Sequence, residues 1–137
     1  MDVITVDHQR GLSASIVVGT HRVTVDQPVQ DGGEDRGPTP TQLFVASLAA
    51  CVEYYASRFL VRHDMDPEGL RVECRFEMAH EAPARVASIR LRVLTPPGFP
   101  AARGRALAAV VEHCTVHNSI VEAPVVELDV VEPRSAA

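Results

Sequence analysis

The sequence predicts an α+β fold, because short β-rich runs and helical segments alternate along one chain of 137 residues. Between Ile4 and Val29 the β-branched residues gather in short runs, which are typical of a meander of two or three antiparallel strands. A later stretch, 70–94, alternates apolar and charged residues with the period of two that a half-buried strand requires. A long apolar segment lies between these regions and predicts a buried helix.

Within the first region, two runs are the clearest strands, Ser15–Val18 and His21–Val25. Gly19 and Thr20, which separate them, suit a tight turn. The stretch Gln30–Pro40 is rich in Gly, Pro and acidic residues, so it is expected to be a loop. It does not mark a domain boundary, because the segment after it is too apolar to stand alone.

The central helix is predicted from Thr41 to about His63. Thr39 is placed to cap its N-terminus, and Pro40 occupies the first helical position, where a missing N–H costs nothing. Apolar residues cover nearly the whole circumference of this segment, so we expect a helix that is buried on every side. A chain of this length is too short to cover such a helix alone, which predicts a homodimer.

The second region is expected to be a hairpin whose second strand runs from about Ala87 to Leu94. Its first strand points one set of side chains inward: Leu70, Val72, Cys74, Phe76 and Met78. Three further elements complete the expected order, namely a helix from about Pro100 to His113, a helical turn over Thr115–Val121 and a last strand over Val125–Val131.

Composition and charge argue against several classes of protein. The net charge is −5 and all 13 basic residues are arginines scattered among acids, so no stripe for nucleic acid is expected. No apolar run reaches the ~20 residues of a membrane span, so no membrane contact is expected. The start, Met1–Ile4, does not resemble a signal peptide, which predicts a cytoplasmic protein. The length predicts one domain over 1–137 with a loose tail at 132–137.

The odd number of cysteines argues against a secreted disulfide framework. Free cysteines are most often small buried hydrophobes, and Cys74, on the inward face of its strand, is expected to be structural. Cys51 lies inside the predicted helix, on one face with Tyr55. Cys114 falls where one helix ends and a helical turn begins. If Thr115 caps that turn, unpaired N–H groups and the positive end of a dipole lie near the Cys114 sulfur.

Two stretches of the chain resemble motifs of the OsmC/Ohr family, which comprises osmotically inducible and organic-hydroperoxide-resistance proteins. The run Gly37–Cys51 resembles the central-helix signature of that family, and His113–His117 resembles its second cysteine motif, usually Cys-Pro-Val-His. The upstream residues 26–28 and 32–33 also fit the family's loop. The order of elements matches over nearly the whole chain.

This resemblance implies two antiparallel β-sheets around a long central helix, made by two intertwined subunits. It also implies that Cys51 attacks a hydroperoxide and becomes a sulfenic acid. Cys114 would then resolve it as a disulfide, which a small dithiol or a lipoylated protein would reduce. No cofactor and no metal is implied.

Family members also supply an arginine from the N-terminal strands, often from the partner subunit, because a buried thiolate needs a positive neighbour. By position this is Arg10, with Arg22 as the weaker candidate. Peroxide-reducing branches commonly have a Glu at the position of Thr41 to hold that arginine, and a hydroxyl anchors it less firmly. We expect Thr41, Phe44 and Tyr55 to contact the substrate.

Two alternatives fit the same residues. A member of this fold could act as a thiol redox sensor or bind a small molecule without efficient peroxidase turnover. Turnover of cumene hydroperoxide with excess dithiol separates that function from a peroxidase. A zinc site could use Cys51, His113, Cys114 and His117, since Cys-x-x-His on a turn can ligate zinc. It is the less favoured alternative because the chain has no Cys-x-x-Cys partner.

Overall fold

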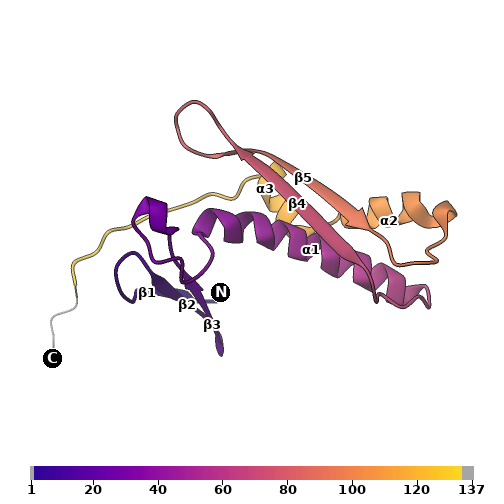
Figure 1. Cartoon of the computed structure of the whole chain (residues 1–137), viewed down its shortest axis with the longest axis horizontal. Coiled ribbons are helices and arrows are strands. Elements are labelled where there is room, and N and C mark those ends of the chain that lie inside the picture. The colour runs from indigo at the N-terminus through magenta and orange to yellow at the C-terminus, as the bar shows by residue number, and fades with distance from the viewer. Residues whose placement is uncertain (1, 134–137) are drawn as a thin grey trace.

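The computed structural model describes residues 2–133, and it places the strands in two separate sheets around one long helix (Figure 1). The three-stranded sheet lies beyond the N-terminal end of α1, whereas the other elements lie along α1. The order is β1 (Ile4–His8), β2 (Ala14–Val18), β3 (His21–Val25), α1 (Pro40–Arg62), β4 (Arg71–Met78), β5 (Val86–Leu94), α2 (Gly104–Val111) and α3 (Thr115–Val121). This architecture confirms the predicted α+β fold.

The N-terminal strands form an antiparallel meander in the order β1-β2-β3, as predicted. Val18 pairs with His21, so that only Gly19 and Thr20 remain to make the turn. Gly19 has a φ of 57°, a left-handed conformation that glycine adopts without a steric penalty. The turn therefore lies where the sequence predicted it.

The start of α1 is fixed by a reciprocal cap. The hydroxyl of Thr39 accepts a hydrogen bond from the backbone N–H of Gln42 at 3.1 Å, and the side-chain oxygen of Gln42 accepts one from the N–H of Thr39 at 2.9 Å. This capping box satisfies two N–H groups that would otherwise be unpaired. Pro40 occupies the first helical position, so the prediction of the helix start is confirmed.

The prediction that α1 is buried on every side is wrong for the single chain. One face is buried, by Val45, Leu48, Val52, Ala56, Phe59 and Leu60. The opposite face exposes Tyr54 and Val61, which are 56% and 60% accessible to solvent. The reason is that one hairpin and two short helices pack against a single side of α1.

By length and composition α1 is also able to cross a membrane, so the expectation that no segment reaches this limit is wrong. Within this fold α1 is a core helix instead. Its buried side chains form two apolar clusters with α2, α3 and the strands β4 and β5. One cluster centres on Phe59, Leu60 and Leu107, and the other on Leu48, Val52 and Cys114.

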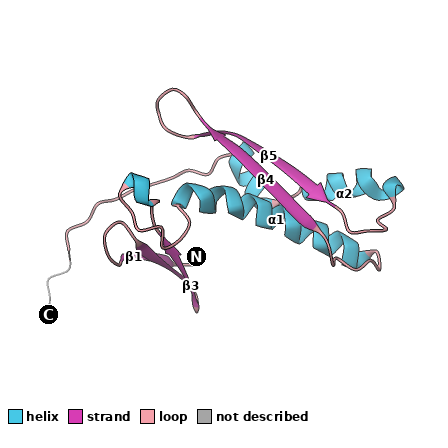
Figure 2. Ribbon diagram, viewed as in Figure 1, coloured by secondary structure: helices cyan, strands magenta, loops and turns pink. Residues whose placement is uncertain are grey.

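The second predicted hairpin is confirmed as the long β4–β5 ribbon, which lies along α1 (Figure 2). Its register runs from Arg71 opposite Leu94 to Met78 opposite Val86, with an irregularity at Glu77 and Met78. Apolar residues of both strands, Val72 and Ile89 among them, pack against the cluster that contains Cys114.

The C-terminal part departs from expectation in two places. The second helix is shorter than predicted, since a 3₁₀ turn precedes α2, whereas α3 agrees with prediction. The expected last strand over Val125–Val131 is wrong: this segment runs as an extended loop and pairs with no strand in residues 2–133 (Figure 2). Its apolar side chains are exposed, Val130 to 93%. Of the expected tail, residues 134–137 lie outside the described residues.

Candidate functional site

The two cysteines expected to work together are in contact. Cys51 lies in the middle of α1, and Cys114 directly precedes α3. Cys51 packs against the cluster of Leu48, Val52 and Cys114, so the two thiol side chains lie close to each other. Both are free thiols, and Cys51 is half-buried whereas Cys114 is 0% exposed.

The surroundings of Cys114 favour its protonated form. Burial raises the pKa of the Cys114 thiol, and the neighbouring Cys51 thiol raises it further. Two backbone N–H groups, those of His117 and Val116, act in the opposite direction but do not outweigh these effects. The pair therefore has one protonated thiol in the core and a second thiol that is closer to solvent.

The N-cap of α3 is Cys114 rather than Thr115, which corrects the expected capping residue. The sulfur of Cys114 accepts a hydrogen bond from the backbone N–H of His117 at 3.4 Å. The hydroxyl of Thr115 is instead 3.3 Å from that of Tyr55, one helical turn after Cys51. Tyr55 also packs against the Cys114 cluster. This contact ties the start of α3 to α1 next to the two sulfurs.

The arginines predicted to assist the thiols lie elsewhere in the chain. Arg10 lies in the turn between β1 and β2, and the sheet that these strands form lies beyond the N-terminal end of α1 (Figure 1). Its guanidinium binds both carboxylate oxygens of Glu34, at 3.1 and 2.7 Å. Arg22 is exposed on β3. A single chain thus does not bring either arginine to Cys51, which lies in the middle of α1.

Glu34 is a residue that the sequence analysis missed. Thr41 was expected to hold Arg10 less firmly than a glutamate would, and in the single chain Arg10 has a charged anchor elsewhere, in Glu34. The backbone N–H of Glu34 donates to the buried carboxylate of Asp26, which also accepts from the N–H of Arg36. Twenty-four positions separate Arg10 from Glu34, and only the fold of the loop between them reveals the pair.

Asp26 is the centre of that loop. Burial acts to raise the pKa of its carboxyl, but hydrogen bonds from the N–H groups of Gln27, Arg36 and Glu34, together with the charge of Arg36, hold it below the usual value. Gly33 approaches the carbonyl of Gln27 so closely that a Cβ at position 33 would collide with it. The sequence resemblance in this loop thus has a structural basis in a buried carboxylate and a close backbone contact.

The three residues expected to contact substrate do not line one common cavity. Phe44 lies two turns before Cys51 and lines a cavity of about 440 Å³ together with Ile89 and His117. Tyr55 lines a different cavity, of about 340 Å³, between α1 and α2. Thr41 is half-buried in the first turn of α1. Of the three, Tyr55 is the one that packs against the cysteine cluster.

A metal site does not form from the residues considered for it. Among residues 2–133, no three His, Cys, Asp or Glu side chains lie together in a way that could hold a metal ion. The sulfur of Cys114 already accepts the hydrogen bond from the N–H of His117.

Comparison with known proteins gives the same architecture. A protein from Psychrobacter arcticus, described as an osmotic stress induced and detoxification response protein, is 22% identical with a TM-score of 0.78 over 87% of this chain and 88% of that chain. The organic hydroperoxide resistance protein OhrB of Bacillus subtilis is 18% identical with a TM-score of 0.61 over 85% and 89%. At these identities the similarity concerns the fold.

An OsmC-like protein from Mycoplasma pneumoniae is 16% identical with a TM-score of 0.74, over 90% of this chain and 89% of that chain. No curated protein matches the sequence. A model of the family described as OsmC-like protein matches residues 32–129, which include both Cys51 and Cys114. That match covers most of the chain, and the chain therefore belongs to the OsmC-like protein family.

Proposed function

We propose that this protein is a thiol-dependent peroxidase that reduces organic hydroperoxides. The observation that carries the proposal is the contact between two free thiols of unequal environment. Cys51 is half-buried, whereas Cys114 is fully buried beside it. A reactive pair of this kind needs one sulfur that attacks the oxidant and a second sulfur that then forms a disulfide with the first.

In the first step the thiolate of Cys51 attacks the terminal oxygen of the hydroperoxide. The O–O bond breaks, an S–O bond forms, and the alkoxide leaves as an alcohol after taking a proton. Cys51 is now a sulfenic acid and the peroxide has been reduced. In the second step the sulfur of Cys114 attacks that of Cys51, its proton leaves with the hydroxyl as water, and a disulfide remains. A dithiol, free or as the lipoyl group of a protein, reduces the disulfide.

The proposed site needs a positive group next to Cys51, and we expect a second copy of the chain to supply Arg10. Two features support a homodimer. The face of α1 with Tyr54 and Val61 is apolar and exposed, and the sheet that carries Arg10 exposes Ile4 and Val6 to 59% and 60%. Burial of both surfaces between two copies would be favourable. The cytoplasm, where thiols stay reduced, suits such a pair.

Mass spectrometry after one equivalent of cumene hydroperoxide tests the chemistry directly. The expected product has lost two hydrogen atoms, and peptide mapping finds a link between Cys51 and Cys114. Excess dithiothreitol should then support repeated turnover. Formation of the disulfide without repeated turnover would favour a redox sensor instead. Failure to form any Cys51 product would exclude both thiol functions.

A further inference from the structure

The cavity between α1 and α2 has the shape and the lining of a binding site for a ligand that the thiol chemistry does not require. The cavity of about 340 Å³ lies between the C-terminal half of α1 and α2. Its apolar walls come from Tyr55, Phe59 and Val110, of which Phe59 belongs to the buried core. This volume is within the range of about 300–1,000 Å³ that is typical of pockets for small molecules.

The remaining walls of this cavity are cationic or basic. They consist of Arg58 and Arg62, one turn apart on α1, and of His63 and His113. Among residues 2–133, no carboxylate lines the cavity. Neither arginine takes part in any of the ion pairs found within residues 2–133. Two guanidinium groups without a carboxylate partner, next to an apolar wall, are complementary to an anion with an apolar body.

A metal ion does not explain this arrangement. Within the described part of the chain the cavity offers two histidines and no cysteine or carboxylate. One of these histidines, His63, already has its Nδ1 2.8 Å from the carbonyl oxygen of Phe59. The positive charge of Arg58 and Arg62 would repel a cation. The apolar wall also favours an organic acid over inorganic phosphate, which has no apolar surface to bury.

We propose that this cavity binds an apolar monocarboxylate, with its carboxylate at Arg58 and Arg62 and its apolar body against Phe59 and Val110. The proposal does not rest on the proposed function, although Tyr55 lines this cavity and also packs against the cysteine cluster. The cavity is nevertheless close to the thiols, because Cys51 and Arg58 lie on the same stripe of α1 and the helical rise separates them by about 10 Å.

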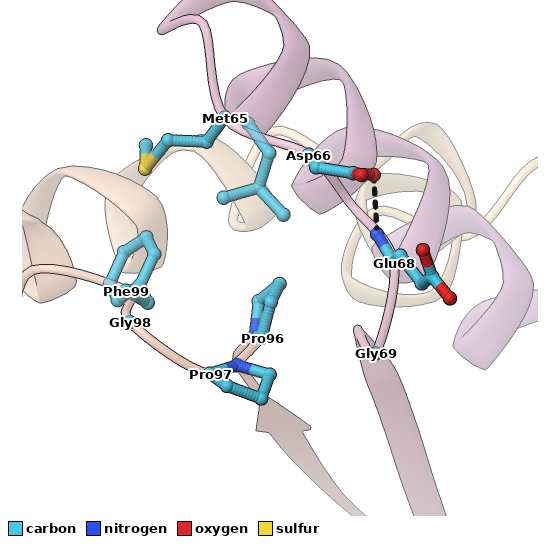
Figure 3. Close-up of a pocket in the computed structure, with 9 residues that line it drawn as sticks. Met65, Asp66, Glu68, Gly69, Pro96, Pro97, Gly98 and Phe99 are labelled. Atoms are coloured by element: carbon cyan, nitrogen blue, oxygen red, sulfur yellow. Dashed lines mark hydrogen bonds between the residues drawn. The ribbon is translucent and has the colours of Figure 1, made fainter.

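A larger cavity in the same molecule provides an internal comparison. It has a volume of about 580 Å³ and lies between the end of α1 and the loop before α2. Apolar side chains such as Met65 and Phe99 face it, but its charged residues are Asp66 and Glu68 (Figure 3). The carboxylate of Asp66 accepts a hydrogen bond from the backbone N–H of Glu68 at 2.9 Å. A carboxylate ligand should avoid this acidic cavity, although the cavity is larger.

Calorimetric titration of the purified full-length chain with decanoate, decan-1-ol and inorganic phosphate tests the proposal. Wild type should bind decanoate about tenfold or more tightly than decan-1-ol, because the alcohol lacks the charge-assisted hydrogen bonds. Phosphate should not compete. Equal affinity for decanoate and decan-1-ol, no binding of decanoate, or competition by phosphate would each overturn the proposal.

Two variants and one control locate the ligand. The double variant Arg58→Gln/Arg62→Gln should weaken decanoate binding about tenfold or more and leave decan-1-ol binding unchanged. Val110→Phe, which fills the cavity, should weaken both. The control Arg75→Gln/Arg90→Gln removes the same charge from an exposed cross-strand pair of the β4–β5 ribbon and should bind as wild type does. Circular dichroism verifies the fold of each variant.

If the control weakens decanoate binding as strongly as the double variant does, net charge accounts for the effect and the proposal is wrong. It is also wrong if Val110→Phe, folded as wild type, binds both ligands with unchanged affinity.

Discussion

The two sheets of this protein are buried to very different degrees. The β4–β5 ribbon lies on α1, and residues such as Val72, Ile89 and Leu91 complete an apolar cluster. The β1–β3 sheet also has an apolar face, since its register aligns Val6, Ile16 and Val23 in one row. That face is largely uncovered: Val6 is 60% and Val23 39% exposed.

The difference extends to the residues of the proposed reaction. The well-packed part of the chain holds both thiols, whereas the poorly covered sheet holds Arg10 and its anchor Glu34. The first part has the apolar contacts that stabilise a fold, and the second is organised by the polar contacts of Asp26. We infer that the first part can function as a scaffold by itself, whereas the second needs the surface of another copy.

The largest expected effect on peroxide consumption comes from the two cysteines, which lie in the well-packed part of the chain. Cys51→Ser should abolish consumption of cumene hydroperoxide, because serine cannot form a sulfenic acid. Cys114→Ser should consume one equivalent and then stop, since no resolving thiol remains, and dimedone should label Cys51. The measurement is single-turnover peroxide consumption followed by mass spectrometry. Single-turnover activity in the Cys51 variant, or preferential dimedone labelling of Cys114, would contradict these roles.

The next largest effect is expected at Arg10, which the poorly covered β1–β3 sheet carries. Arg10→Ala should slow the first step about tenfold to a hundredfold, because a hydrogen bond to a charged group contributes about 1.5–3 kcal/mol. Glu34→Gln should slow it less, since the guanidinium remains but loses its charged anchor. Stopped-flow kinetics of hydroperoxide consumption measures both. Arg22→Ala, on the exposed strand β3, is the control, and an equal loss in that variant would argue against a specific role for Arg10.

What the sequence predicted well is local. The cap at Thr39 and Pro40, the two-residue turn at Gly19, and α3 depend on neighbours within a few positions, and all three are confirmed. The contact of Cys51 with Cys114 was expected from a motif resemblance, because no local pattern connects residues so far apart.

What the sequence predicted poorly depends on surfaces. A hydrophobic pattern reports which side chains require burial but not which chain covers them. Hence α1, expected to be buried all round, exposes Tyr54 and Val61. For the same reason Val125–Val131 has the composition of a strand and no sheet edge beside it in the described chain. The pair of Arg10 with Glu34 was missed because an ion pair between loops leaves no periodic signal.

A charge introduced on the apolar face of the β1–β3 sheet should weaken the expected homodimer. Sedimentation at micromolar concentration should find a homodimer for the wild type. Val6→Glu should weaken it about tenfold or more, since a charge buried without a partner is unfavourable. Thr5→Glu, which adds the same charge to the other face of β1, should have a smaller effect. A folded wild-type monomer would contradict the shared site, as would equal dissociation of the two variants.

A smaller effect is expected at Cys74, which lies opposite Leu91 in the packed ribbon. Burial raises the pKa of its thiol, so at neutral pH it stays protonated and unreactive. Cys74→Ala should lower the free energy of unfolding by about 1–2 kcal/mol through a small cavity. Urea denaturation measures this loss, and peroxide turnover should stay at the wild-type level. A folded variant without turnover would show that Cys74 takes part in the reaction.

The smallest effect is expected in the loop around Asp26. Because the folded pKa of this carboxyl lies below its usual value of about 3.9, its contribution to stability is complete above that value and is lost as the pH falls through the folded pKa. Asp26→Asn should therefore reduce the stability at neutral pH and make the loss of stability on acidification shallower. Urea midpoints between about pH 7 and pH 3 measure this slope.

The exposed Asp31 of the same loop provides the matched control, because Asp31→Asn removes the same charge without removing a buried acceptor. Hydrogen exchange at the N–H groups of Glu34 and Arg36, which donate to Asp26, should become faster in Asp26→Asn alone. An equal change in both variants would mean that the net charge of the loop, rather than the buried carboxylate, organises this half of the protein. In that event Glu34 would also not depend on Asp26 to hold Arg10.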